Sequence, residues 1–138
     1  MTNESLGRSY LRKANDRLKV LDLLLKEGGY SDVVREAQEL VELALKGMLR
    51  AIGIEPPKLH DVGALLLQHR DRFAPDVQKT LDTLASISKE LRKDRELAFY
   101  GDIDFIPTEE YSLDQAQRAR ERAAKVLDVA RRVVVPEP

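Results

Sequence analysis

The sequence predicts an all-α protein: an antiparallel up-and-down bundle of four long helices, with a short extra helix between the second and third. Three observations indicate this fold. Apolar residues recur every three or four positions along four stretches, glycine and proline separate those stretches, and no segment alternates as a strand does. With 138 residues, 43% of them hydrophobic, we expect one domain covering residues 1–138.

The first two long helices are separated by a pair of glycines. Apolar residues spaced by three or four positions over 6–25 predict the first helix, which Gly28-Gly29 should end. We expect Ser31 to cap the second helix, which should end at Gly53. This helix carries two apolar stripes and should therefore lie at the centre of the bundle. The stripes are Val33, Ala37, Leu40, Ala44 and Met48, and Val34, Val41, Leu45, Leu49 and Ile52.

Prolines mark the next boundaries. The pair Pro56-Pro57 requires a loop, because neither residue continues a helix. A short helix of about two turns is expected from His60 to Gln68, with His60-Asp61 as a capping arrangement at its start. The segment Phe73-Ala74-Pro75 should break the chain again.

The last two long helices follow that break. Apolar residues from Asp76 to Phe99 predict the third long helix, before Gly101. The fourth opens at Ser112, with Gln115 three residues later in the spacing of a capping box. Its arginines could follow a nucleic-acid backbone, but they are interspersed with Glu121 and Asp128, a mixture that is typical of an exposed face. They are Arg118, Arg120, Arg122, Arg131 and Arg132.

Composition excludes several classes of protein. The chain has no cysteine, which excludes a disulfide scaffold and a thiolate nucleophile, and it has two histidines, so we expect no metal site. No glycine-rich phosphate loop is present, and no cofactor is predicted. The sequence shows neither a signal peptide nor a membrane span, so we expect a cytoplasmic protein without membrane association. At a net charge of -1, contact with nucleic acid would depend on local clusters of arginine.

One charged residue lies where packing favours an apolar side chain. At about 100° per residue, Arg95 returns to the same side of its helix as Val77, at the centre of the apolar stripe. A guanidinium there needs a partner, because an unpaired buried charge is costly. Two interpretations stay open. In the structural one, Arg95 forms an ion pair with Glu36 or Glu39 of the second helix, or its stem extends to the end of the bundle. In the functional one, it faces a cleft or dimer seam and binds an anion such as phosphate.

Four segments together carry a resemblance to a known family. They read YSDVVREAQELVELALKGMLRAIGI, PPKLHDVGALL, LRKDRELAFYGD and PTEEYSLDQAQRARERAAKVLDVAR. In this order and spacing they resemble the HEPN domain over nearly the whole chain. The features that contribute most are the proline loop leading to His60-Asp61, the segment from Arg95 to Tyr100, and the Tyr111-Ser112 entry into an alanine-rich last helix.

The resemblance implies an activity from which this sequence departs. Many HEPN proteins are metal-independent endoribonucleases, often toxins paired with a minimal nucleotidyltransferase antitoxin, and use an arginine followed four to six residues later by a histidine. Arg95 matches the arginine, but residues 96–107 contain no histidine and Tyr100 stands about where one is expected. A tyrosine titrates near pH 10 and is a poor general base near neutrality.

We therefore predict a noncatalytic HEPN homodimer that binds a nucleotide or RNA, or that docks a nucleotidyltransferase partner in a toxin–antitoxin pair. Two alternatives remain. The chain is a metal-independent endoribonuclease in which Tyr100, Asp94 or Asp102 replaces the histidine, or it is a structural interaction domain in which Arg95 only closes an ion pair. The candidate ligand-binding residues are Arg95, Tyr100, Asp94, Asp102 and Glu36.

Overall fold

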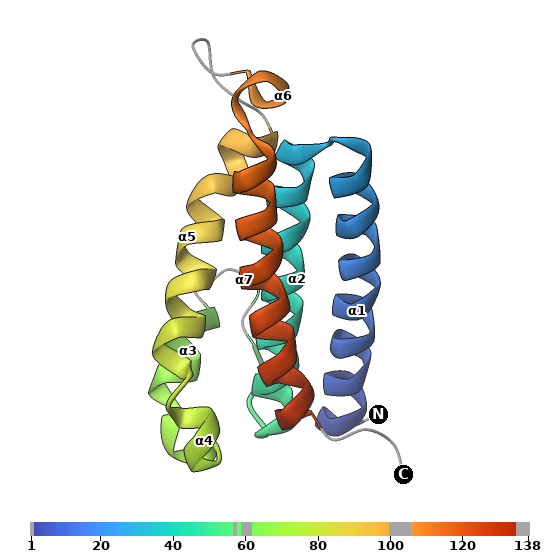
Figure 1. Cartoon of the computed structure of the whole chain (residues 1–138). Helices are drawn as coiled ribbons and strands as arrows, with labels where there is room; N and C mark the ends of the chain where they lie inside the picture. The colour runs from blue at the N-terminus through green and yellow to red at the C-terminus, as the bar shows by residue number, and fades with distance from the viewer. Residues whose placement is uncertain (1, 57, 59–61, 100–105, 135–138) are drawn as a thin grey trace.

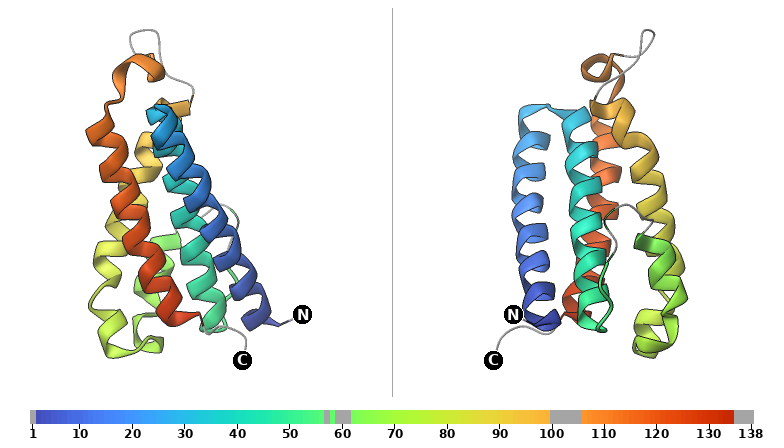
Figure 2. Two further views of the ribbon diagram at one scale, coloured as in Figure 1. Left: turned by 45° about the vertical axis from the view of Figure 1, so that its right-hand side comes forward. Right: turned by 180° about the vertical axis from the view of Figure 1, so that it is seen from behind.

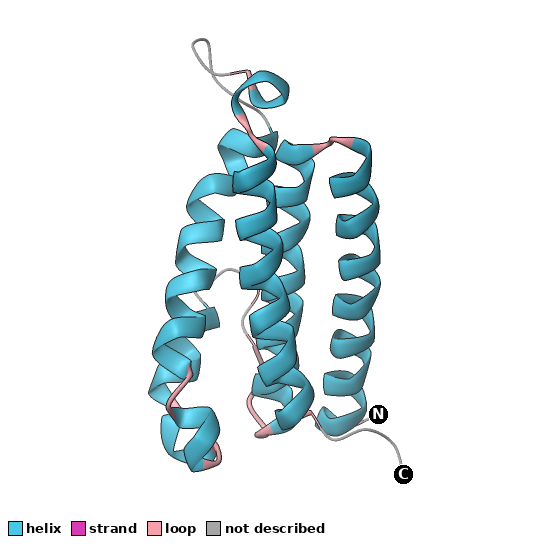
Figure 3. Ribbon diagram, in the orientation of Figure 1, coloured by secondary structure: helices cyan, strands magenta, loops and turns pink. Residues whose placement is uncertain are grey.

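The computed structural model of the chain describes residues 2–56, 58, 62–99 and 106–134, and for residues 95–99, 107 and 109 it describes the backbone alone. All regular structure in these ranges is helical (Figure 1, Figure 3), which confirms the predicted all-α fold. Among the described helices, none combines the length and the apolar character that crossing a bilayer requires.

Four long helices form the body of the molecule. Both termini lie at one end; α1 runs away from that end, α2 returns, α5 runs away and α7 returns (Figure 1, Figure 2). Short elements join them at the two ends. In chain order the elements are α1 (Asn3–Glu27), α2 (Tyr30–Ala51), α3 (Val62–Gln68), the 3₁₀ turn η1 (Arg70–Arg72), α4 (Pro75–Gln78), α5 (Leu81–Phe99), α6 (Pro107–Glu110) and α7 (Leu113–Val133).

The central position predicted for the second helix is confirmed. Helix α2 packs against α1, α5 and α7, and both of its predicted stripes are buried, apart from the partly buried Ile52. The stripe predicted for the third long helix is buried as well, through Val77, Leu81, Leu84, Ile87 and Leu91. The core is therefore formed around α2, because the most extensive contacts between the long helices all involve it.

The connection between α1 and α2 is tighter than the sequence suggests. Gly28 has φ +84° and ends α1, and the amide of Gly29 donates to the carbonyl of Leu24 at 2.8 Å, as in a Schellman motif. The carbonyl of Gly29 already accepts from the amide of Val33, so α2 begins at Tyr30. The prediction that Ser31 caps α2 is wrong, because the two-glycine turn leaves Ser31 inside the first turn, where it is buried.

The third long helix begins later than predicted. The helix predicted from Asp76 is split into α4 and α5, with Lys79 and Thr80 between them. The hydroxyl of Thr80 donates to the carbonyl of Val77 at 2.7 Å, and the Thr80 amide donates to the same oxygen. A side-chain hydroxyl that competes for a backbone carbonyl in this way interrupts a helix. Leu81 therefore opens α5.

The remaining boundaries agree with the sequence in part. The predicted short helix is present as α3, while His60 and Asp61 lie outside the described residues. The capping box of α7 is confirmed. The backbone amide of Gln115 donates to the Ser112 hydroxyl at 3.2 Å, and the backbone amide of Ser112 donates to the side-chain Oε1 of Gln115 at 2.9 Å. The single turn α6 was not predicted.

Candidate functional site

A cleft lies between α5 and α7, near the end of the bundle that is opposite the termini. Both helices pack mainly on α2 and make few contacts with each other, so their polar edges stay apart. The cleft has a volume of about 350 Å³. Its lining comes from α2, α5, the segment between α6 and α7, and α7 itself: Val34, Leu91, Asp94, Tyr111, Gln115, Arg118, Ala119 and Arg122.

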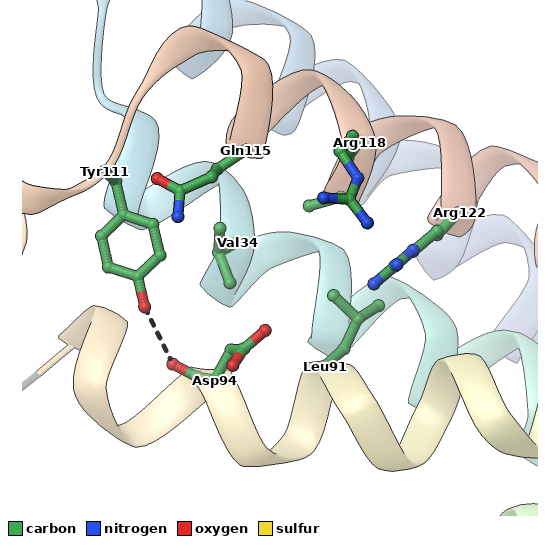
Figure 4. A pocket seen from close by; sticks show the side chains of 8 residues that line it. Val34, Leu91, Asp94, Tyr111, Gln115, Arg118 and Arg122 are labelled. Atoms are coloured by element: carbon green, nitrogen blue, oxygen red, sulfur yellow. Dashed lines mark hydrogen bonds between the residues drawn. The ribbon is translucent and has the colours of Figure 1, made fainter.

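The floor of the cleft is apolar and its rim is polar. Val34, Leu91 and Ala119 are buried and close the bottom. In Figure 4 the guanidinium groups of Arg118 and Arg122 reach from α7 toward α5, where Asp94 lies on the opposite wall. In the cleft, two guanidinium groups thus face one carboxylate above a buried apolar base.

The two arginines differ in their partners. Arg122 Nη1 lies 2.8 Å from Glu90 Oε2 on α5, an ion pair that bridges the two helices. Arg118 is exposed, and the described part of the chain gives its guanidinium no carboxylate within ion-pair distance. Arg118 is therefore the cation at this site that an external anion can bind without breaking an existing pair.

Tyr111 closes the cleft at the end nearest α6. Its hydroxyl donates to the backbone carbonyl of Asp94 at 3.4 Å (Figure 4). Burial of the ring raises the pKa of the Tyr111 phenol above its usual value, and the negative charge of Asp94 raises it further. The phenol therefore stays protonated and acts as a hydrogen-bond donor.

The candidates predicted from the sequence fall in different places. Asp94 lines the cleft. The backbone of Arg95 lies in α5 directly after Asp94, one turn beyond Leu91, which places this position beside the cleft. The side chain of Arg95, and all of Tyr100 and Asp102, lie outside the described residues.

Glu36 lies on the other side of α2, toward α1. It is 4% exposed and accepts from Arg35 Nη2 at 3.1 Å, while Arg17 Nη1 of α1 lies 3.7 Å away. Glu39 lies in the same cluster, 3.6 Å from Arg35 and 4.0 Å from Arg17. The structure therefore places Glu36 in the contact between α1 and α2, away from the cleft. The predicted ion pair of Glu36 with Arg95 involves a side chain outside the described residues.

The contribution of α7 to a cleft was not predicted. From the sequence, Arg118 and Arg122 could follow a nucleic-acid backbone, but they were assigned to an exposed face because acidic residues intersperse them. The available signal was the spacing: Gln115, Arg118 and Arg122 are separated by three and four residues, so they share one side of the helix. That side adjoins the buried alanines, which sets it apart from a fully solvated face.

The arrangement is suited to holding an anion. A guanidinium offers several N–H donors in a planar fork that matches phosphate or carboxylate, and the Tyr111 hydroxyl and the Gln115 amide add neutral donors. Among the described residues that line the cleft, none is a histidine or a cysteine. The described lining of the cleft therefore brings several anion-binding groups together.

Comparison with known proteins gives a family match over most of the chain. The family model described as the HEPN domain matches residues 8–133, a range that contains the four long helices apart from the first residues of α1. A search of curated proteins finds no match.

Proposed function

The chain belongs to the HEPN family, and on that premise we propose that it binds the phosphate of a nucleotide or of RNA in the cleft between α5 and α7 without cleaving it. The observation that carries the proposal is the position of the Arg118 guanidinium. This group borders the cleft and has no carboxylate partner in the described part of the chain. Phosphate would supply that partner with charge-assisted hydrogen bonds.

The lining of the cleft supports binding over cleavage. Cleavage of RNA without metal needs a group that takes up and releases a proton near neutral pH. The described cleft residues contain no imidazole, and the raised pKa of Tyr111 keeps its phenol protonated. Asp94 accepts hydrogen bonds, so it suits a ribose hydroxyl or a base amino group beside a phosphate on Arg118.

We also propose that the protein acts as a homodimer and that a nucleotidyltransferase is its partner, as in a toxin–antitoxin pair. Two exposed apolar side chains support the dimer: Ile106 and Leu113 are 49% and 45% exposed and flank α6, at the end of the bundle that carries the cleft. A second copy that covered them would lie beside the two clefts. This pairing is proposed because many HEPN proteins are paired with a minimal nucleotidyltransferase, and a nucleotidyltransferase encoded in the neighbouring reading frame would support it.

A binding titration tests the role of Arg118. We expect adenosine monophosphate to bind the wild-type protein, and Arg118→Gln to weaken binding about tenfold or more, because one charged hydrogen-bonding group is lost. The matched control is Arg132→Gln, which removes the same charge from α7 at a position that does not line the cleft.

The control decides between a site and a general charge effect. Calorimetry or fluorescence at fixed ionic strength gives the three dissociation constants. Equal weakening by Arg118→Gln and Arg132→Gln would contradict a site in the cleft, as would wild-type protein that binds no nucleotide.

A further inference from the structure

A second hollow continues the cleft along the groove between α5 and α7. It has a volume of about 480 Å³. It shares Arg122 with the cleft, so the two hollows adjoin at that side chain. Its lining residues are Asp82, Thr83, Ser86, Ile87, Glu90, Arg122 and Lys125.

Three cations line this joint groove along one edge of α7. Arg118, Arg122 and Lys125 are separated by four and three residues, so they follow one another along one side of the helix. We call them the basic row. From first to last they span about 10 Å along the helix axis, farther than the oxygens of a single phosphate reach.

Two of the three carboxylates on the opposite wall have cationic partners. Asp82 lies 2.9 Å from Nη2 of Arg70, and Glu90 is paired with Arg122. The hydroxyls of Thr83 and Ser86 stand between them as neutral donors. Arg70 therefore reduces the repulsion between Asp82 and a bound anion, whereas Asp94 and a released Glu90 remain as carboxylates that face the basic row.

The pair between Glu90 and Arg122 is placed to be exchanged. Their side chains are 50% and 33% exposed, and ion pairs at that degree of exposure are weak. A phosphate offers Arg122 more acceptor oxygens than the single Glu90 oxygen at 2.8 Å. An anion that enters the groove can thus replace Glu90 as the partner of Arg122.

We propose that the two hollows form one site for a chain of linked phosphates, which the basic row binds in succession while Glu90 releases Arg122. This inference rests on the proposed function, since its first phosphate is the one on Arg118. Successive phosphates occur in a nucleoside triphosphate, which joins them directly, and in single-stranded RNA, which joins them through ribose; in both, the groups that the basic row would bind are charged phosphate oxygens.

The experiment measures the affinities of adenosine monophosphate, adenosine triphosphate and a short single-stranded RNA for four proteins: wild type, Lys125→Gln, Glu90→Gln and Lys89→Gln. Lys89 is exposed on α5 and lines neither hollow, so Lys89→Gln is the control for loss of one positive charge.

We expect Lys125→Gln to lower the affinity for the ligands that carry linked phosphates about tenfold and to leave the affinity for the monophosphate unchanged. For RNA, a plot of log affinity against log salt concentration should also become shallower, its slope falling by about 0.7 in magnitude. Glu90→Gln should strengthen binding several-fold, because it frees Arg122. An effect of Lys125→Gln on the triphosphate alone, or on RNA alone, identifies which source of linked phosphates the site takes.

Other outcomes separate the two proposals. If the monophosphate binds through Arg118 but Lys125→Gln matches Lys89→Gln for every ligand, the inference fails and the proposed function stands. Weaker binding by Glu90→Gln would also overturn the exchange. If none of the three ligands binds the wild-type protein, both proposals fail.

Discussion

Arg118 and Arg122 lie one turn apart on α7 and have different surroundings. Arg122 is held by Glu90 across the groove, whereas Arg118 borders the cleft without a carboxylate partner in the described residues. Surface arginines are usually either paired with a carboxylate or fully solvated, and in neither case does the guanidinium border a cleft. Arg118 combines an available guanidinium with a buried apolar floor and a neighbouring phenol, which is why the proposal centres on this residue.

The ionisation of Tyr111 gives a prediction that depends on pH. Its pKa is raised in the folded protein by burial and by Asp94, so above about pH 10 the unfolded chain loses the phenolic proton first. The stability linked to this proton is fully present below that pH and is lost as pH rises through the folded pKa. We expect the wild-type free energy of unfolding to fall more steeply above about pH 10 than that of Tyr111→Phe.

Urea unfolding at a series of alkaline pH values checks this difference in slope. Tyr111→Phe also removes the hydrogen bond to the Asp94 carbonyl, and that loss shifts stability by a constant amount at lower pH. Parallel curves for the two proteins above about pH 10 would contradict a raised pKa.

At the scale of the helices, two glycines set how closely α1 and α2 approach. A Cβ on Gly47 would lie 3.2 Å from the carbonyl oxygen of Gly7, and a Cβ on Gly7 would lie equally close to the carbonyl oxygen of Gly47. The two backbones therefore meet without side chains between them. Both positions are buried, so an added methyl group has no free space to occupy.

We predict that Gly47→Ala lowers the free energy of unfolding by about 1 kcal/mol. Overpacking at this contact costs about 1–3 kcal/mol, and the better helix propensity of alanine offsets about 1 kcal/mol of it. Chemical denaturation of the two proteins gives the difference. A variant as stable as wild type, or more stable, would show that α1 and α2 move apart enough to accommodate the added methyl group without loss of stability.

The sequence predicts the elements where a regular pattern is repeated many times. The two stripes of α2 involve ten residues, and their periodicity is enough to place the helix at the centre of the bundle. Ser31 and Thr80 are single residues whose hydrogen bonds decide a boundary, and one residue type fits several local structures. Ser31 fails as a cap because Gly29 already takes that position, and Thr80 interrupts a helix that its apolar neighbours would continue.

At the scale of the whole molecule, the candidate site depends on how far two helices stand apart. Asp94 was predicted as a possible replacement for the missing histidine, but Arg118 and Arg122 were not predicted to line a cleft, because the sequence of α7 does not reveal that α5 leaves a cleft beside it. That spacing follows from both helices packing on α2. Tyr100 and Asp102 lie outside the described residues, so their part in the site stays a prediction.

The proposed dimer gives a prediction about mass in solution. Leu113 is 45% exposed and opens α7, where a glutamate is favourable for the helix. We expect Leu113→Glu to shift the protein from dimer to monomer, because it places a charge in the proposed contact. Light scattering over a dilution series measures the change. The control is Leu23→Glu, at an exposed position of α1.

The two variants also locate the contact. Dissociation by Leu23→Glu, with no effect of Leu113→Glu, would move the dimer contact from the α6 end to α1. Wild-type protein that is monomeric at every concentration would contradict the dimer itself.

The central claim is that this HEPN protein binds the phosphate of a nucleotide or of RNA without cleaving an RNA strand, and one measurement tests it most directly for RNA. Single-stranded RNA is incubated without metal with wild type, Arg118→Gln and Arg95→Ala, and both the bound fraction and the RNA length are recorded. We predict RNA of unchanged length that is bound by wild type and released by Arg118→Gln. RNA that wild type shortens and Arg95→Ala leaves intact would contradict the claim and establish a ribonuclease that acts without the usual histidine.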